Sequence, residues 1–168
     1  INRYGLLRRC NLIIQKAQES TTLTEGEKAE VIAKGRLLRG LVFFDQARKM
    51  GRFVPMREVI ATGEEEKATI PMTKSVEESY KYVLEDLEAS VSAMPTIAQP
   101  GEPTKYAVEV LLSRAYLTAY AYTKNASYID KAITYAKDVT ENCSLSDNYG
   151  GLFNETDETN AEILWGYY

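Results

Sequence analysis

The stretch that decides the fold of this chain is residues 33–56, AKGRLLRGLVFFDQARKMGRFVPM. It forms the larger part of a helix that we expect to begin at Thr24, because Thr24 and Glu27 have the spacing of a capping box. The helix is expected to end at Met50, since Gly51 follows it and glycine is common just after a helix. The sequence therefore predicts one long helix with a defined start and end.

The apolar face of this helix carries small residues at every seventh position, namely Ala33, Gly40 and Ala47. Residues at this spacing lie on the same side of a helix. Small side chains there allow a neighbouring helix to approach closely. We therefore expect Gly40 to lie where a second helix crosses.

Four further segments have the apolar spacing of helices. They are Asn2–Ser20, Ser75–Met94, Thr104–Thr123 and Ser127–Cys143. Ser75 and Glu78 have the spacing of a second capping box, and Pro95 ends the apolar pattern that they open. Ser127 is expected to cap the last helix.

The fold class that follows is all-α, with antiparallel helical hairpins around a shared core. Residues 57–74 are expected to be an irregular crossing segment, and 162–168 to begin a strand. Leu112–Tyr116 and Tyr128–Ile133 resemble the two helices of a tetratricopeptide (TPR) repeat, so that the hairpin they form is expected to be TPR-like. We expect residues 1–168 to form a single helical unit.

The composition excludes several classes of function. The chain has 20 basic and 24 acidic residues, so no basic excess is available to hold a phosphate backbone, and nucleic-acid binding is disfavoured. Histidine is absent and no CxxC pair occurs, so we expect no zinc, no other metal and no cofactor. We interpret Cys10 and Cys143 as small buried side chains rather than as a disulfide. Because the chain opens at Ile1 in the pattern of a helix interior, we expect it to be a fragment of something longer.

Several segments together resemble the SusD/RagB family. Residues 33–56 are similar to the family signature A-x-x-R-[FL]-L-R-A-x-x-[YF]-F-D-[LQ]-x-R-x-[FY]-G-x-[VI]-P-[LM], with Gly40 in place of alanine and one extra residue before Pro55. Further segments are similar to family patterns in the same order; these are 4–14, 75–95, 104–117, and 149–153 with 160–163. The resemblance therefore covers nearly the whole chain.

This resemblance implies a larger, mostly helical SusD-like fold, of which the chain is the scaffold part. It implies a non-catalytic protein that binds glycan at the cell surface and delivers oligosaccharide to a SusC-like TonB-dependent transporter. It also implies a lipid-anchored protein of the outer membrane, whose anchor lies outside these residues.

The candidate ligand-binding residues are Trp165, Tyr167 and Tyr168, because the family leaves its helical scaffold for ligand-bearing loops at this point. Aromatic rings stack on sugar rings, and the chain has 12 tyrosines. Most of these, including Tyr80, Tyr116 and Tyr128, are expected to pack inside the protein or at helix crossings.

No residue is expected to be catalytic. We interpret Arg39, Asp45 and Arg48 as residues that tie their helix to its neighbours through hydrogen bonds. Asn11 is expected to be buried and bonded to backbone. Asp86 is expected to be a solvated charge, since it and its neighbour Glu85 point about 100° apart on a helix and are poorly placed to act as a pair of acids.

Two other functions remain open from the sequence. A TPR-type protein-interaction scaffold is favoured by the TPR-like hairpin, whereas the signature at 33–56 counts against it. A helical glycan hydrolase with two carboxylates is compatible with the lack of histidine, but no suitable pair is visible in the sequence.

Overall fold

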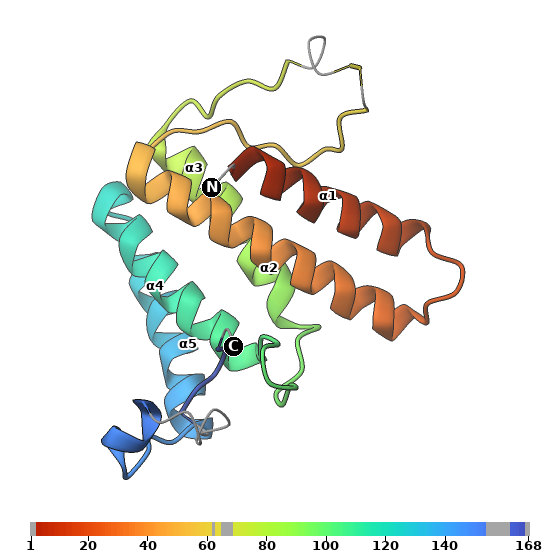
Figure 1. Ribbon diagram of the computed structural model, residues 1–168. Helices are drawn as coiled ribbons and strands as arrows, with labels where there is room; N and C mark the ends of the chain where they lie inside the picture. Colours follow the sequence, from red (N-terminus) through yellow and green to blue (C-terminus); the bar gives the residue numbers. More distant parts are fainter. Residues whose placement is uncertain (1–2, 62, 65–68, 154–161, 167–168) are drawn as a thin grey trace.

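A computed structural model describes residues 3–61, 63–64, 69–153 and 162–166. Within these ranges the chain forms five α-helices and one short 3-10 helix (Figure 1). Their bounds are α1 Arg3–Glu19, α2 Glu25–Met50, α3 Val76–Val91, α4 Lys105–Thr123, α5 Ser127–Asn142 and η1 Tyr149–Phe153. The predicted all-α fold class is confirmed. The strand expected at 162–168 is not formed over 162–166, where the described chain is irregular.

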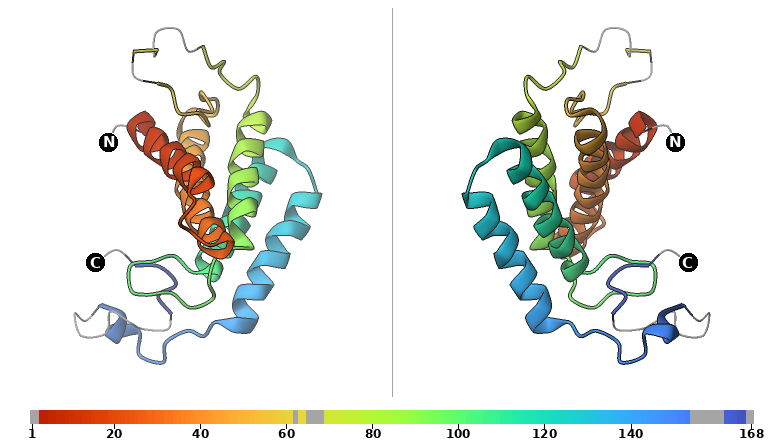
Figure 2. Two further views of the ribbon diagram at one scale, coloured as in Figure 1. Left: turned by 90° about the vertical axis from the view of Figure 1, so that its right-hand side faces the viewer. Right: turned by 90° about the vertical axis from the view of Figure 1, so that its left-hand side faces the viewer.

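The helices follow one another as antiparallel hairpins. Each packs mainly against its neighbours in sequence, α1 on α2, α2 on α3, α3 on α4 and α4 on α5. Figure 2 shows the arrangement from the side, where α1 and α5 lie at opposite edges and α2, α3 and α4 lie between them. The long connection between α2 and α3 leaves the helices at one end of the bundle (Figure 1), as expected for the irregular crossing segment.

The ends of α2 have the predicted chemistry. The Glu27 amide donates to Thr24 Oγ1 at 3.3 Å, and the Thr24 amide donates to Glu27 Oε2 at 2.8 Å, which completes the capping box. At the other end, Gly51 has φ of 74°, a conformation that side chains other than glycine rarely adopt, and its amide donates to the Ala47 carbonyl.

Two other helix starts differ from the prediction. Ser75 does accept a hydrogen bond from the Glu78 amide, but the Glu78 carboxylate accepts from the Lys74 amide, so the box is only half formed. Ser127 is the first residue of α5 and not its cap. The side chain of Asn125 forms the hydrogen bonds before this helix instead, because its Oδ1 accepts from both the amide and the hydroxyl of Ser127.

The core lies between the inner faces of the helices. Its largest fully buried side chains include Tyr80, Phe43, Phe53, Leu7, Leu37, Leu87 and Leu112. Tyr80 and Tyr116 are buried as expected, and Tyr116 packs against Tyr128, with ring centroids 5.3 Å apart. Cys10 is buried and Cys143 is half-buried, and both are free thiols.

Gly40 lies at the crossing of α2 and α3, as its spacing predicts. A Cβ atom placed there would lie 2.8 Å from Leu87 Cδ2 and 3.4 Å from Asp86 Cβ. The backbone of α2 therefore lies so close to α3 at Gly40 that a side chain there would force Leu87 to shift. Ala33 and Ala47, on the same side of α2, are each 1% exposed.

We predict that Gly40→Leu lowers the free energy of unfolding by about 1–3 kcal/mol, because the new side chain overfills the crossing despite the better helix propensity of leucine. The matched control is Gly26→Leu in the first turn of α2, where a Cβ atom meets nothing within 4 Å. This control is expected to stabilise the protein slightly. Chemical denaturation measures both, and equal midpoints for Gly40→Leu and the unsubstituted chain would contradict the close crossing.

Candidate functional site

A buried ion pair and one side-chain amide join three helices. Arg39 of α2 donates from Nε to Asp86 Oδ2 and from Nη2 to Asp86 Oδ1, both at 2.7 Å, across to α3. Its Nη1 donates to Asn11 Oδ1 on α1 at 2.8 Å. Arg39 is 6% exposed and Asp86 is 3% exposed. The expectation of a solvated Asp86 is therefore wrong, because its face of α3 is the one that meets α2.

Asn11 extends this network to the crossing segment. Its Nδ2 donates to the carbonyls of Met56 and Glu58, at 3.1 and 3.0 Å. The side chain is 3% exposed and bonded to backbone, as predicted. One amide therefore holds α1, α2 and the start of the crossing segment together.

Asp45 and Arg48 have different roles from Arg39. Asp45 accepts from Arg3 Nε of α1 at 3.0 Å, so it ties α2 to a neighbouring helix as expected. The contacts of Arg48 lie within α2, with Asp45 at 3.8 Å and with the Phe44 ring, whose centroid is 5.0 Å from the guanidinium carbon. The hydrogen bond from Lys49 lowers the pKa of Asp45, and Arg3 lowers it further.

We predict that Asp86→Ala destabilises the fold by about 3–5 kcal/mol, since it leaves the Arg39 guanidinium buried without its anion. Asp45→Ala removes an ion pair of similar chemistry whose side chains are about one-third exposed, and is expected to cost about 1 kcal/mol or less. Urea denaturation of the two variants measures the difference. Similar losses for both would show that the Arg39–Asp86 contact is no stronger than a surface pair.

Trp165, one of the predicted ligand-binding residues, lines a groove of about 440 Å³ between α4 and residues 162–165, to which Leu41 of α2 also contributes. Its indole is 39% exposed, and its Nε1 donates to the Gly101 carbonyl at 3.1 Å. The neighbouring Leu164 carbonyl accepts from Thr104 Oγ1 at 3.0 Å, which holds this segment against the start of α4. The indole N–H is thus already bonded, whereas the residue as a whole is partly exposed. Tyr167 and Tyr168 lie outside the described residues.

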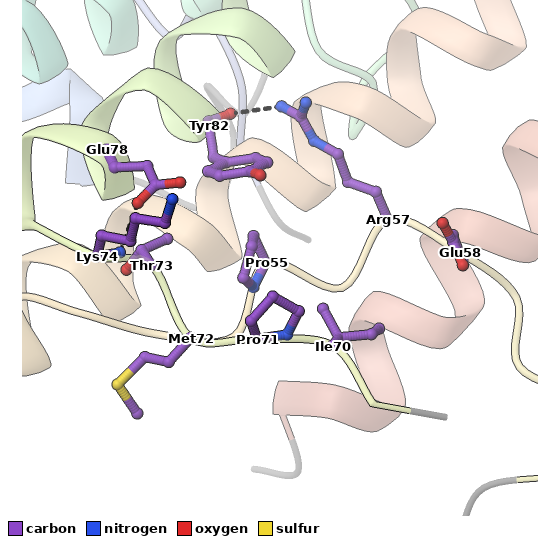
Figure 3. Close-up of a pocket in the computed structure, with 10 residues that line it drawn as sticks. All are labelled: Pro55, Arg57, Glu58, Ile70, Pro71, Met72, Thr73, Lys74, Glu78 and Tyr82. Carbon is purple, nitrogen blue, oxygen red and sulfur yellow. Dashed lines mark hydrogen bonds between the residues drawn. The ribbon is translucent and has the colours of Figure 1, made fainter. Parts of the chain in front are cut away.

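A second pocket, which the sequence did not indicate, lies where the crossing segment meets α3 (Figure 3). It has a volume of about 310 Å³ and lies between the two limbs of the crossing segment and α3. Tyr82 of α3 forms one wall, and the rings of Pro55 and Pro71 lie next to it in the close-up. Lys74 and Glu78 supply charged groups on one side.

This pocket is held in shape by Arg57. Its guanidinium carbon lies 4.6 Å from the Tyr82 ring centroid, and its Nη2 donates to the Tyr82 carbonyl at 2.9 Å. Its Nη1 donates to Glu85 at 2.7 Å. The two limbs are joined below it, where the Thr73 amide donates to the Phe53 carbonyl at 2.9 Å. The pocket is thus a preformed apolar hollow with a charged rim, the usual form of a small-molecule site.

The Tyr82 pocket was missed because it joins residues that are far apart in the sequence. Tyr82 follows the helical spacing of α3 and is indistinguishable there from a core tyrosine. The only local indication was the pair of prolines, Pro55 and Pro71, that border an irregular segment.

One pair of carboxylates lies close together, on α4 and α5. Lys105 Nζ lies 3.3 Å from Glu109 Oε1 and 2.6 Å from Asp138 Oδ2. Burial raises the pKa of Glu109, and its hydrogen bond with Asp138 adds to the rise. Glycoside hydrolases hold two carboxyl groups about 5 Å or more apart on either side of an accessible bond. Glu109 is only 3% exposed and shares its lysine with Asp138, so this pair does not have that geometry.

Glu109 should make stability depend on pH. Because its pKa is raised above the ordinary 4.5, the folded protein holds a proton that the unfolded chain has lost, and stability falls as the pH rises through this window. We predict that Glu109→Gln removes the loss of stability with rising pH that is due to Glu109. Thermal unfolding from about pH 4 to 7 measures it. Glu141→Gln, an exposed carboxylate on α5, controls for the loss of one charge, and identical pH profiles for all three proteins would contradict the prediction.

Two further observations concern the described part of the chain. No group of three or more potential metal-ligating side chains is found there. None of its helices has the length and apolar character needed to cross a membrane.

Fold and site together define a helical scaffold of antiparallel hairpins. No sequence-family model matches the chain. A SusD-like protein of Bacteroides ovatus is 25% identical over 173 residues, an alignment that covers 96% of this chain and 30% of that protein. The resemblance to SusD-like proteins is therefore confirmed in the sequence.

Solved structures confirm it in the fold. A SusD-like carbohydrate-binding protein from Bacteroides fragilis has a TM-score of 0.81 at 22% identity, with 97% of this chain and 31% of that chain covered. A structure with xylogluco-oligosaccharide has a TM-score of 0.83 at 23% identity, with coverage of 97% and 33%. The chain is thus SusD-like in sequence and fold, and spans about a third of the length of the relatives it matches.

Proposed function

We propose that this chain is part of a protein that binds glycan at the cell surface and delivers oligosaccharide to a TonB-dependent transporter. The observation that supports it most is the match along 96% of the chain to a SusD-like protein. Solved structures of the same fold include one described as carbohydrate-binding and one with a xylogluco-oligosaccharide. The protein is proposed to bind its ligand without breaking bonds.

The partner and the location follow from the same family resemblance. A SusC-like transporter would receive the oligosaccharide, and a lipid anchor outside these residues would hold the protein on the outer membrane. The proposed unit is one helical scaffold made of residues 1–168. A protein-interaction scaffold of TPR type is the second candidate, favoured by the α4–α5 hairpin, in which Ala115 and Ala132 are buried at 0% and 2% exposure.

Within this chain, Trp165 is the proposed stacking residue, together with Tyr167 and Tyr168. The Tyr82 pocket is a second candidate, because it combines ring faces with charged groups that can bond hydroxyls. Neither position encloses a ligand on all sides. We therefore expect most ligand contacts to lie outside residues 1–168, and the chain alone to bind glycan weakly or not at all.

We predict that the protein encoded by the whole reading frame binds oligosaccharides, and that Trp165→Ala weakens this binding several-fold through the loss of a stacking face. Titration calorimetry with a panel that includes xylogluco-oligosaccharides measures the affinity. The control is Tyr149→Ala, which removes a 74% exposed ring from η1, away from both pockets. Tight binding by the 168-residue chain alone would place the site on these helices instead.

The dependence on salt distinguishes a glycan from a charged ligand. Stacking and hydrogen bonds to hydroxyls are screened little by ions, so the affinity should change little between about 0.1 and 1 M salt. A steep fall with salt would indicate a ligand held by charge. Turnover of any polysaccharide in the panel would contradict the non-catalytic proposal.

A further inference from the structure

The Tyr82 pocket is small, and several rings line it. Its volume of about 310 Å³ is at the lower end of the range of about 300–1,000 Å³ that small-molecule sites span. The ring of Tyr82 lies next to those of Pro55 and Pro71 in the close-up (Figure 3), and Ile70 and Met72 add to the apolar lining. A hollow of this size suits a single ring of a ligand rather than an extended chain.

The wall of the pocket that carries Lys74 is fixed by its neighbour Thr73, which is 2% exposed. The Oγ1 atom of Thr73 accepts from the Phe53 amide at 3.2 Å and lies 2.7 Å from Ser79 Oγ of α3. Its carbonyl accepts from Arg52 Nε at 2.6 Å. The pocket is therefore formed without a ligand, and binding requires little further ordering of the chain.

The positive charge of Arg57 is already matched within the protein. Its guanidinium lies 2.7 Å from Glu85 Oε2 and 3.4 Å from Asp86 Oδ1. It therefore supports the wall of the pocket but supplies no surplus charge to a ligand. The other charged residues that line the pocket are Glu58, Lys74 and Glu78.

These three remaining charges nearly cancel. The ammonium group of Lys74 lies beside the carboxylate of Glu78 in the close-up, so the two offset each other (Figure 3). Glu58 is exposed, and its charge is therefore solvated. An acidic ligand would find no excess of positive charge here, and a basic ligand would find only a carboxylate that water already screens. The charge balance thus favours an uncharged ligand.

Lys74 and Glu78 supply the hydrogen-bonding groups. Within the described residues, no hydrogen bond or ion pair engages the Lys74 ammonium, which can therefore donate to a ligand. Glu78 accepts from the Lys74 amide through Oε2, which leaves Oε1 to accept from a ligand. A hydroxyl group both donates and accepts, so a ring with two hydroxyl groups can bond both side chains. A purely apolar ring would leave them without partners.

We propose that the Tyr82 pocket binds one uncharged sugar ring and is a binding site separate from Trp165. Its C–H groups pack against Tyr82, Pro55 and Pro71, while its hydroxyl groups accept from Lys74 and donate to Glu78. This proposal rests on the proposed function, because it requires that the protein binds glycan.

Two measurements on the protein encoded by the whole reading frame test the site. Titration calorimetry reports binding anywhere on the protein. The methyl signal of Met72 in a protein with ¹³C-labelled methionine methyl groups reports binding at the pocket, since Met72 lines it and is 51% exposed. Met72→Leu assigns this signal, and Met94, which is 6% exposed and does not line the pocket, is the internal reference.

The probes are a xylogluco-oligosaccharide, which is uncharged, an acidic oligogalacturonate and a basic chitosan oligosaccharide. The uncharged probe is expected to shift the Met72 signal to saturation and to leave Met94 unchanged. Each charged probe is expected to need a concentration at least about tenfold higher, because a charge placed next to a like charge is costly. A Met72 response to either charged probe at the same concentration would overturn the assignment to an uncharged ring.

The variant Lys74→Ala removes the donor from an exposed position. It is expected to weaken the Met72 response to the uncharged probe several-fold. The matched control is Lys81→Ala, which removes a 58% exposed lysine side chain of α3 that does not line the pocket, and its response should equal that of the unsubstituted protein. Equal responses in Lys74→Ala and Lys81→Ala would overturn the role of Lys74 in the site.

The two measurements separate this proposal from the proposed function. Heat of binding without a shift of Met72 would overturn the site in the Tyr82 pocket and leave glycan binding by the protein intact. Neither heat nor shift with any of the probes would contradict both.

Discussion

The Arg39 guanidinium is the point on which the helical arrangement depends. Its two bonds to Asp86 set the distance and rotation of α2 relative to α3, and its third nitrogen bonds Asn11 of α1. Because these groups are almost completely buried, none of them finds water as an alternative partner, and any shift of one helix leaves a charge unpaired. Gly40 lies one residue further along α2, where a side chain would meet Asp86 and Leu87. The pair forms at short range because the glycine lets the two helices approach.

The same carboxylate connects the scaffold to the Tyr82 pocket. Arg57, which forms one side of that pocket, lies 3.4 Å from Asp86 Oδ1 as well as 2.7 Å from Glu85 Oε2. The crossing segment is further held by Asn11, which bonds the carbonyls on both sides of Arg57. An irregular segment without helical hydrogen bonds thus acquires a defined shape from side chains of α1 and α3. This is how a rigid helical scaffold can support a preformed site on a loop.

The pockets of the chain differ in chemistry. The Tyr82 pocket and the partly exposed Trp165 combine aromatic or proline rings with nearby polar groups, which suits a hydroxyl-rich ligand that is bound and released unchanged. The two grooves that Leu41 borders are lined mostly by apolar side chains, together with Arg3, Asp45, Lys49, Arg114 and Glu162. Glu109 and Asp138 share one lysine, and Glu109 is almost completely buried, so the two carboxylates do not flank an accessible bond.

Local chemistry in the sequence determined the helices, the capping box at Thr24, the end of α2 at Gly51 and the place of Gly40, because these depend on neighbours within one or two turns. The burial of Asn11 followed from its position on an apolar stripe. Only the tertiary structure decided that Asp86 is buried, because its partner Arg39 lies on α2, 47 residues away in the sequence. Only the tertiary structure placed Arg57 against Tyr82. It also showed that Asn125, and not Ser127, accepts the side-chain hydrogen bonds at the start of α5. It also left the strand expected near the end unformed over 162–166. Side-chain spacing specifies which face of a helix is apolar, but the residue that meets a particular polar group is fixed only when the helices pack.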